Sequence, residues 1–388
     1  MQINQKDSLQ YNPKLMHNFV STQLLIYKME ISGKEYPHPI FFAGKNRLSL
    51  NKLLEKLLPD NEGQIVVLCD VNTGKYCYPI LKEALPVKQH YSIVISEGEK
   101  AKQLKTCETI WDFLISKNIK KDALLINLGG GVVSDIGGLA ASLYMRGLRF
   151  INIPTTLMAM TDAAIGGKTG INFNNFKNNI GNITFPDAVI IDVNFLKTLT
   201  KREFNSGLIE MVKHGLIADI NFFTGITENK FSDDLIEAIA ISAKIKMDII
   251  SEDPFDSGHR RILNFGHTIG HAIESAYSLH SEKAVLHGEA VLLGMIAETN
   301  LSLLNGLLQQ EDHDWIISRL KPYIQNINFT DQNLDNIFSI LLHDKKHSSL
   351  QLNFSLLKKT GEALSGQNAD ADKIKQSLRF LQQILSNI

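Results

Sequence analysis

The feature that most constrains the fold is a series of short apolar runs in the first half of the chain. The runs lie at residues 64–70, 91–96, 123–128, 150–153 and 188–192. They are largely continuous rather than alternating, which is typical of parallel strands buried on both faces. The segments between them, such as 101–116 and 133–145, show helical spacing. This alternation predicts an α/β domain with a Rossmann-like, doubly wound parallel sheet.

The pattern changes after about residue 195. Thr200 and Glu203 have the spacing of a capping box, which predicts a helix that continues to residue 216. Further helical patterns lie at 234–251, 268–277, 290–304, 314–320 and 372–385. The one clear strand signal in this half is at 350–356. We therefore expect three parts: an N-terminal extension at 1–35, an α/β domain at 36–193 and a mostly α-helical domain at 194–388.

Charge and hydropathy exclude several classes of protein. The 40 Lys and Arg residues against 41 Asp and Glu give a net charge of -1, so a global basic field for nucleic acid or an anionic membrane is absent. No stretch reaches the roughly 18 uninterrupted apolar residues of a membrane span. The first residues lack the apolar segment of a signal peptide. With three cysteines and no CxxC spacing, the chain is expected to be cytoplasmic.

Three glycines at 129–131 follow one predicted strand and open a helix. Glycine lets backbone N–H groups approach a phosphate, and the N-terminus of a helix favours negative charge. The pattern differs from the usual Rossmann fingerprint, because no acidic residue stands about 20 positions further on to hold a ribose. A nucleotide pyrophosphate site and a plain tight turn both fit these glycines.

Lys168 follows two glycines, and Lys177 and Asn178 come within ten residues of it. A P-loop would need glycine at position 162, where the chain has Asp162, so ATP-type binding is disfavoured. A lysine beside a glycine-rich turn can still anchor a phosphate as a point charge. We expect an anion site here, with ordinary surface charge as the alternative.

Histidines are concentrated in the second half. Of the 12 in the chain, five fall within 29 residues: His259, His267, His271, His280 and His287. His267 and His271 are four residues apart, so they share a helix face and have the spacing of a chelating pair. Glu210 lies on the first helix of this half, and a carboxylate with two or three imidazoles suits zinc or cobalt. Spacing alone leaves open which histidines would be ligands.

The motifs together resemble the 3-dehydroquinate synthase family of the sugar-phosphate cyclase superfamily. The resemblance extends over about residues 64–358, in family order, and its motifs are specific. The matching blocks are 97–102, 129–135, 144–147, 154–157, 162–169, 177–181, 195–199, 207–215, 263–271, 287–290 and 344–346.

This resemblance implies an enzyme of the shikimate pathway, and so of aromatic amino-acid biosynthesis. It would convert 3-deoxy-D-arabino-heptulosonate 7-phosphate to 3-dehydroquinate and phosphate. The steps would be transient NAD-dependent oxidation, β-elimination, reduction and intramolecular aldol closure, which makes it a carbon–oxygen lyase. NAD and a divalent metal, zinc or cobalt, are the implied cofactors, and a homodimer is the implied assembly.

The resemblance also implies roles for particular residues. The metal ligands would be Glu210, His267 and His287. NAD would be bound by Asp70, Asn72, Glu99, Lys102, Gly130, Gly131, Asp135, Thr155, Thr156, Lys168, Lys177, Phe195 and Thr198. Substrate would be bound by Arg146, Asp162, Lys168, Lys177, Asn178, Lys213, Lys246, Arg260, Asn264, His271 and one of Lys345 and Lys346. Among these, the catalytic groups would be Asp162, Lys168, Lys213, Asn264 and His271. Arg146 would reach the site of the partner subunit.

One departure from the family pattern concerns the backbone. Phe176 stands where a glycine normally precedes the Lys177–Asn178 pair, and glycine is the residue that tolerates positive φ.

Three other functions remain open: another sugar-phosphate cyclase, a metal-dependent polyol dehydrogenase of the same superfamily, and a non-catalytic binding protein.

Overall fold

The structure, a computed structural model, describes residues 36–387 except 45–46, 59–63, 88, 175, 233, 279–284, 326–328 and 344–351. The extension expected at 1–35 lies outside the described residues, and so do Lys345 and Lys346. No helix in the described part has the length and apolar character needed to cross a membrane.

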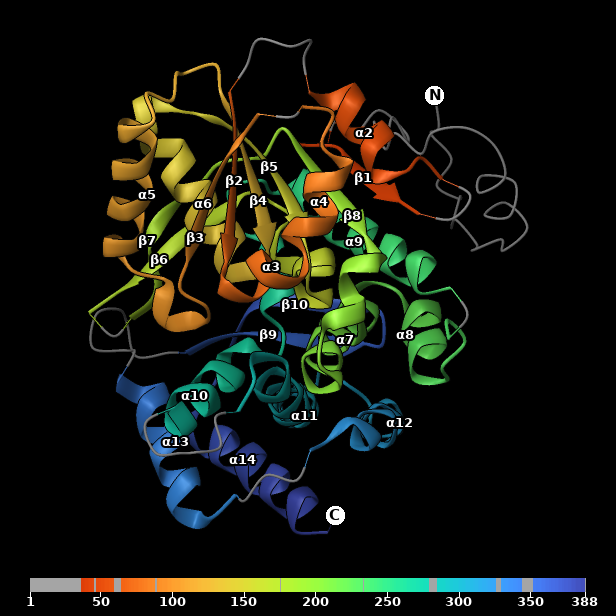
Figure 1. Cartoon of the computed structure of the whole chain (residues 1–388). Helices are drawn as coiled ribbons and strands as arrows, with labels where there is room; N and C mark the ends of the chain where they lie inside the picture. The colour runs from red at the N-terminus through yellow and green to blue at the C-terminus, as the bar shows by residue number, and fades with distance from the viewer. Residues whose placement is uncertain are drawn as a thin grey trace, which may run out of the picture.

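A six-stranded parallel sheet forms the upper half of the molecule, with strand order β1-β8-β5-β4-β2-β3 (Figure 1). The strands are β1 (Ile40–Ala43), β2 (Ile65–Asp70), β3 (Tyr91–Ile95), β4 (Leu124–Gly129), β5 (Arg149–Pro154) and β8 (Ala188–Asp192). All five strands predicted from the apolar runs are confirmed. The sequence analysis missed β1, because its four residues are too short to show a pattern and its pairing with β8 is tertiary.

Helices cover both faces of this sheet, as the doubly wound class requires. They are α2 (Leu50–Leu57), α3 (Val71–Tyr76), α4 (Tyr78–Ala84), α5 (Leu104–Ser116) and α6 (Gly131–Leu143). Val66 and Leu68 of β2 pack with α5 and α6, whereas their neighbours Val67 and Cys69 belong to the core on the opposite face. Both sets are fully buried, which explains why the strand is continuously apolar.

The second half is mostly helical, and most of it lies below the sheet in Figure 1, although α9 (Leu235–Glu252) lies beside the sheet. It contains α7 (Lys201–Ala218), α8 (Ile220–Thr227), α9 (Leu235–Glu252), α10 (His267–Ser278), α11 (His287–Leu304), α12 (Gln310–Leu320), α13 (Asp331–His343) and α14 (Ala371–Ser386). The hairpin of β9 (Leu352–Lys359) and β10 (Glu362–Ala369) packs among them. The predicted helices and the strand near 350 are confirmed. The domain boundary expected near 193 stays a prediction, because the largest apolar core draws residues from both halves.

Two short segments between β5 and β8 carry residues that were predicted to bind substrate. The chain after β5 forms a π-helical turn (Ala159–Ala163) that contains Asp162. It then forms an antiparallel hairpin of β6 (Lys168–Phe173) and β7 (Phe176–Ile183), which packs on α6. Phe176 does not take positive φ, whereas Asn178 does, at 53°. The replacement of the family glycine by Phe176 therefore causes no backbone strain at that position.

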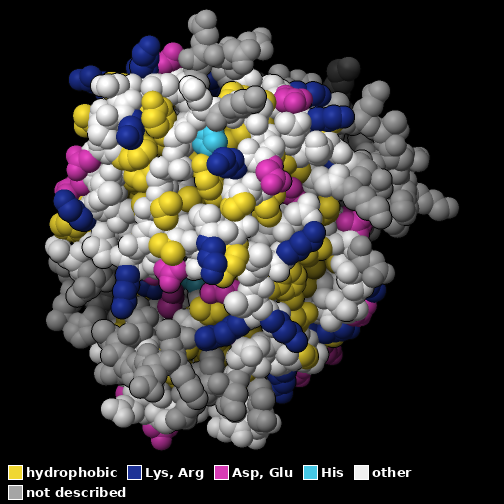
Figure 2. Space-filling model, in the orientation of Figure 1, with side chains coloured by type: hydrophobic (Ala, Val, Ile, Leu, Met, Phe, Trp, Pro, Cys, Tyr) yellow, Lys and Arg dark blue, Asp and Glu magenta, His cyan; other side chains and the backbone are white. Residues whose placement is uncertain are grey.

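The viewed surface carries basic, acidic and apolar side chains intermixed, with no continuous basic field on this face (Figure 2). That distribution agrees with the near-zero net charge of the chain.

Candidate metal and cofactor site

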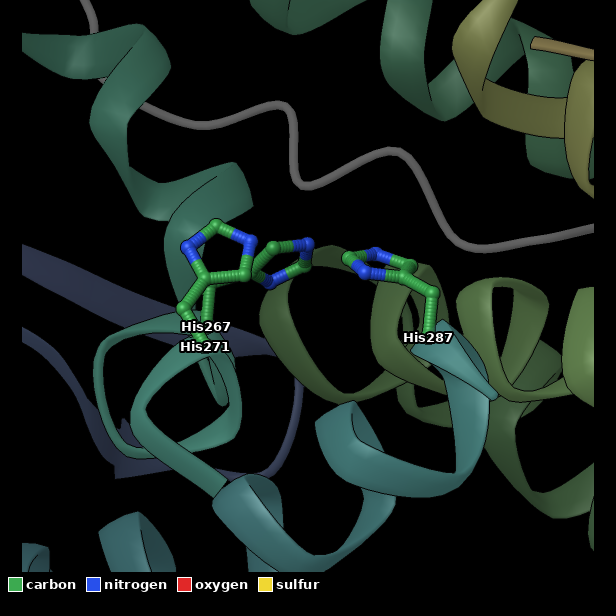
Figure 3. Close-up of side chains that lie close together, drawn as sticks. All are labelled: His267, His271 and His287. Atoms are coloured by element: carbon green, nitrogen blue, oxygen red, sulfur yellow. The ribbon is translucent and has the colours of Figure 1, made fainter. Parts of the chain in front are cut away.

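Three elements bring the predicted metal ligands together. Glu210 lies in the middle of α7, His267 is the first residue of α10 and His287 is the first residue of α11. Figure 3 shows the rings of His267, His271 and His287 grouped together, with ring centroids 5.2–5.7 Å apart. Nε2 of His287 lies 3.5 Å and Nε2 of His267 3.7 Å from the same oxygen, Oε1 of Glu210. Ligand atoms on a tetrahedral zinc ion stand about 3.3 Å apart, so this spacing is close to that of a zinc site.

The environment of Glu210 favours a cation. Its side chain is fully buried, and neither oxygen accepts a hydrogen bond from the described residues, although Lys213 Nζ lies 2.5 Å from Oε2. Burial alone would raise the pKa of Glu210, but Lys213 and His287 outweigh it and hold the pKa well below its usual value. A buried, ionised carboxylate with one oxygen paired to a lysine still has lone pairs that can bind a cation. The residues present therefore fit a divalent metal.

The two histidines differ in protonation because their surroundings differ. Burial, reinforced by Lys213, lowers the pKa of His267 well below its usual value, so its ring is neutral and able to bind metal. Burial also acts on His287, but the nearby carboxylates of Glu210 and Glu274 outweigh it and raise the pKa of His287 to about 9. The protonated ring of His287 lies between the carboxylates of Glu210 and Glu274 and offsets part of their negative charge. A bound metal would offset the same charge.

His271 offers an alternative third ligand. One nitrogen from each of His267, His271 and His287 can be chosen so that all three lie within 4.8 Å of one another. His271 is the most exposed of the three rings, and burial lowers its pKa to about 4. Geometry thus permits either a Glu210 set or an all-histidine set. The charge and burial of Glu210 favour the first.

A second group of predicted residues lies next to Glu210. Lys246 Nζ on α9 is 2.7 Å from Asp162 Oδ1, and His214 Nε2 is 3.8 Å from the same atom. Burial disfavours the charged form of Asp162, but Lys246 and Lys213 hold its pKa well below the usual value. Burial lowers the pKa of Lys246 to about 8, despite its pairing with Asp162. The arrangement places a proton donor of near-neutral pKa beside the candidate metal site.

Three of the other predicted substrate residues are paired with protein groups. Lys168 Nζ pairs with Asp256 at 2.6 Å, and Lys177 Nζ with Glu274 at 2.7 Å. Arg260 is 2% exposed, and its terminal nitrogens donate to the backbone carbonyls of Pro254 and Gly166. Arg260 therefore joins two loops of the site rather than pointing into open space. Asn178, Asn264 and Arg146 are exposed.

The glycine-rich turn has the form expected of a phosphate cradle. A Cβ on Gly129 would stand 2.5 Å from Val133, so glycine is required for the turn from β4 into α6. A Cβ on Gly130 would approach Thr156 at 3.1 Å, and one on Gly131 would approach Ala163 at 3.0 Å. No side chain caps the N-terminus of α6, which leaves its first N–H groups available to an anion. The residues present fit a dinucleotide pyrophosphate.

Lys102 connects this turn to the β6–β7 hairpin. Its buried Nζ donates to Asp135 Oδ2 at 2.6 Å and also hydrogen-bonds Asn178. Burial raises the pKa of Asp135 to about 6, and Lys102 opposes that rise. Three residues predicted from separate motifs thus form one contiguous cluster.

The remaining predicted NAD residues are distributed at the carboxyl ends of the strands. Asp70 ends β2 and caps α3, accepting from the N–H of Thr73 at 2.8 Å. Thr155 and Thr198 both contact the thiol of Cys77. Phe195 is buried and serves the core. Thr198 is exposed, and so are the other two residues, Asn72 and Glu99.

The sequence analysis missed several residues that contact the predicted ones. Glu274 could have been found, because it is seven residues after His267 and so lies on the same face of α10. Glu298 accepts from the N–H groups of Gly266 and Ile269 at the start of α10, and nothing in the sequence marked it. Asp256 and His38 lie in segments without a motif.

Two family models match the chain. The model described as 3-dehydroquinate synthase N-terminal matches residues 92–206, and the model described as 3-dehydroquinate synthase C-terminal matches residues 207–347. The matches together extend over more than half of the chain.

The chain belongs to the 3-dehydroquinate synthase family.

A curated 3-dehydroquinate synthase from Parabacteroides distasonis is 38% identical over 325 residues, which cover 82% of this chain and 92% of the relative. The family and the main activity expected from the motifs are thereby confirmed.

Solved structures of related cyclases superpose on this member of the 3-dehydroquinate synthase family. A 2-epi-5-epi-valiolone synthase from Streptomyces hygroscopicus, with NAD⁺ and Zn²⁺ bound, is 25% identical with a TM-score of 0.77, covering 90% of this chain and 98% of that one. A 2-deoxy-scyllo-inosose synthase complexed with carbaglucose-6-phosphate, NAD⁺ and Co²⁺ gives the same identity and TM-score, covering 88% and 96%.

Proposed function

We propose that this chain forms 3-dehydroquinate and phosphate from 3-deoxy-D-arabino-heptulosonate 7-phosphate, as a phosphate-eliminating lyase with NAD and a divalent metal. The observation that carries the proposal is the convergence of two imidazole nitrogens on one oxygen of the buried Glu210, at 3.5 and 3.7 Å. Glu210, His267 and His287 would hold zinc or cobalt. The two related cyclase structures carry the same cofactors, Zn²⁺ or Co²⁺ with NAD⁺.

The bound groups supply chemistry that side chains lack: the metal polarises substrate oxygens as a Lewis acid, and NAD accepts and returns a hydride. The protein residues hold NAD at the uncapped start of α6, through Gly130 and Gly131. Lys102 and Asp135 border this cradle and fix its position relative to Asn178.

The cationic side chains near the candidate metal site would bind and orient the substrate. Lys168, Lys177 and Asn178 lie on the β6–β7 hairpin and are suited to a phosphate or carboxylate. An incoming dianion would compete with Asp256 and Glu274 for the two ammonium groups. Fixing one conformer of a flexible substrate in this way contributes much of the rate enhancement, because it removes conformational entropy before the reaction.

Proton transfer would involve the substrate and three side chains of the protein. The substrate phosphate would serve as base for the proton removed before elimination, with His271 and Lys213 as relays. Lys246, whose pKa burial lowers to about 8, can exchange a proton with a substrate oxygen near neutral pH. Asp162 keeps Lys246 in place through its carboxylate and its backbone carbonyl.

A homodimer in the cytoplasm remains part of the proposal. Arg146 is exposed at positive φ, next to the exposed apolar side chains of Leu143 and Met145. The exposed Phe176 and Ile180 lie on the hairpin that packs against the same helix, α6. This surface suits a second copy that receives Arg146. Mixing Arg146→Ala with His267→Ala should restore activity that neither variant has alone, because the mixed dimer contains one intact site.

The deciding experiment is turnover by the purified full chain with the heptulosonate phosphate, NAD⁺ and Zn²⁺ or Co²⁺. Phosphate and 3-dehydroquinate should form in equal amounts without net NADH, and a chelator should abolish both. Absence of phosphate release under these conditions would refute the proposal.

The second candidate is another sugar-phosphate cyclase, since the superposed structures are cyclases of other substrates. Assays with sedoheptulose 7-phosphate and glucose 6-phosphate separate it from the first. Net NADH accumulation would indicate a polyol dehydrogenase instead.

A further inference from the structure

His287 lies between two carboxylates. Its Nε2 is 3.5 Å from Oε1 of Glu210, and its Nδ1 is 3.4 Å from Oε2 of Glu274. The other oxygen of Glu274 is 2.7 Å from Nζ of Lys177. In His287, a proposed metal ligand, Nε2 therefore faces the proposed metal position, and Nδ1 faces the carboxylate of Glu274 on the neighbouring helix α10.

We infer that Glu274 is a positioning residue, which orients His287 through its Nδ1–H so that Nε2 faces the metal. The inference rests on the proposed function, which makes His287 a ligand. An imidazole that binds metal through Nε2 carries its proton on Nδ1, and a carboxylate that accepts this proton fixes both the tautomer and the ring plane. It also makes Nε2 a stronger donor to the metal.

The position of Glu274 on α10 suits this role. Glu274 follows His271 by one turn of α10 and His267 by two, so one helix face presents all three. Helices α10 and α11 are in close contact: a Cβ on Gly294 of α11 would stand 1.9 Å from the carbonyl oxygen of Gly266, just before α10. Because the two helices cannot move independently at this point, the side chain of Glu274 is held opposite His287.

Lys177 supplies the other half of the arrangement. Its ammonium group keeps Glu274 paired and ties the β6–β7 hairpin to α10. If Glu274 served only to anchor the hairpin, its role would depend on Lys177. If Glu274 orients His287, its role does not depend on Lys177. The two roles predict different results for the Lys177→Met variant.

The test is metal affinity, measured by competition with a chelating indicator on the full chain stripped of metal. The variants are Glu274→Ala, Glu274→Gln and Lys177→Met, with Glu108→Gln as a control that makes the same charge change at the exposed pair with Lys105. Glu274→Ala should weaken Zn²⁺ and Co²⁺ binding by about 10- to 100-fold. Glu274→Gln, nearly the same shape, should weaken binding by less, because its amide oxygen still accepts from Nδ1–H. Lys177→Met and Glu108→Gln should stay within about twofold of the unchanged chain.

A spectroscopic readout separates orientation from folding. The visible absorption bands of bound Co²⁺ should change in Glu274→Ala and stay unchanged in Lys177→Met, because only the first alters the ligand geometry. If both Glu274 variants bind metal within about twofold of the unchanged chain, the inference is overturned. If the unchanged chain binds no metal, the proposed function fails instead, so the two failures are distinguishable.

Discussion

Arg202 and Glu289 form a bidentate ion pair that joins the start of α7 to the start of α11. Arg202 Nε and Nη2 donate to the two oxygens of Glu289, each at 2.7 Å. Nearby, the N–H of Gly288 donates to Ser206 Oγ at 3.0 Å. Because α7 carries Glu210 and α11 begins with His287, these contacts set the distance between two proposed metal ligands.

Removing the arginine should loosen this connection. In Arg202→Met, Glu289 keeps its hydrogen bond from the N–H of Leu286 but loses its charged partner. We expect the free energy of unfolding of the metal-free protein to fall by about 1–2 kcal/mol, because the pair is charge-assisted but half exposed on the arginine side. Urea denaturation measures this change.

The matched control is Arg149→Met, since Arg149 pairs with Asp187 where both side chains are exposed. That change should lower the free energy of unfolding by less than about 1 kcal/mol. Equal losses in the two variants would show that the Arg202–Glu289 pair has no special role.

The identity of the third metal ligand is directly testable. Glu210→Gln should abolish stoichiometric Zn²⁺ binding, because the amide removes the buried negative charge that favours the cation. His271→Ala should retain one metal per chain while losing turnover, because His271 is proposed to act on substrate. Atomic emission after dialysis measures the metal content of both variants, and phosphate release measures their turnover. The reverse pattern would assign the site to the three histidines, whose geometry also permits a metal.

Close packing of α10 on α11 should be sensitive to one methyl group. In Gly294→Ala, the new Cβ would stand 1.9 Å from Gly266 O and 2.7 Å from the N of Gly270, so α10 must shift away from α11. We expect a loss of about 2–4 kcal/mol in unfolding free energy and weaker metal binding, since His267 begins α10.

Gly74→Ala in α3 provides the comparison, because its Cβ would meet nothing closer than Cys69 Sγ, at 3.3 Å. Its stability should stay within about 1 kcal/mol of the unchanged chain. An unchanged unfolding free energy in Gly294→Ala would contradict the expected clash between α10 and α11.

A buried histidine that has no part in the proposed chemistry should govern part of the sensitivity of the protein to acid. His38 Nε2 accepts from the N–H of Gly166 at 3.1 Å, and burial, with smaller contributions from Lys246 and Arg260, lowers its pKa to about 4. Between pH 6.5 and 4 the unfolded chain therefore binds a proton at His38 that the folded chain does not. The neutral ring of His38 therefore contributes its full stability above pH 6.5. As the pH falls from 6.5 to 4, this contribution to the free energy of unfolding decreases by about 3 kcal/mol.

The His38→Gln variant isolates this effect, because the amide oxygen can still accept from Gly166 and does not titrate. Between pH 7 and pH 4 the unchanged chain should lose about 3 kcal/mol more unfolding free energy than the variant does. Parallel pH profiles from chemical denaturation would show that His38 is not buried as a neutral acceptor.

The sequence alone was sufficient for five of the six parallel strands and most of the helices. Continuous apolar runs report burial on both faces, which is a local property of each segment, so the five predicted strands were found. β1 and the β6–β7 hairpin were not predicted, because the four residues of β1 are held by pairing with β8 and the residues of β7 are mostly exposed. Their structure depends on partners distant along the chain.

The sequence by itself determined the chemical types of the site: a carboxylate on one helix, imidazoles on two others and lysines beside glycine turns. It did not determine which groups meet. Only the tertiary structure placed both histidine nitrogens against one oxygen of Glu210, buried Arg260 against backbone carbonyls and set Glu274 opposite His287. The reason is physical. Residue type and helical period are local, whereas desolvation and ion pairing depend on which elements pack together.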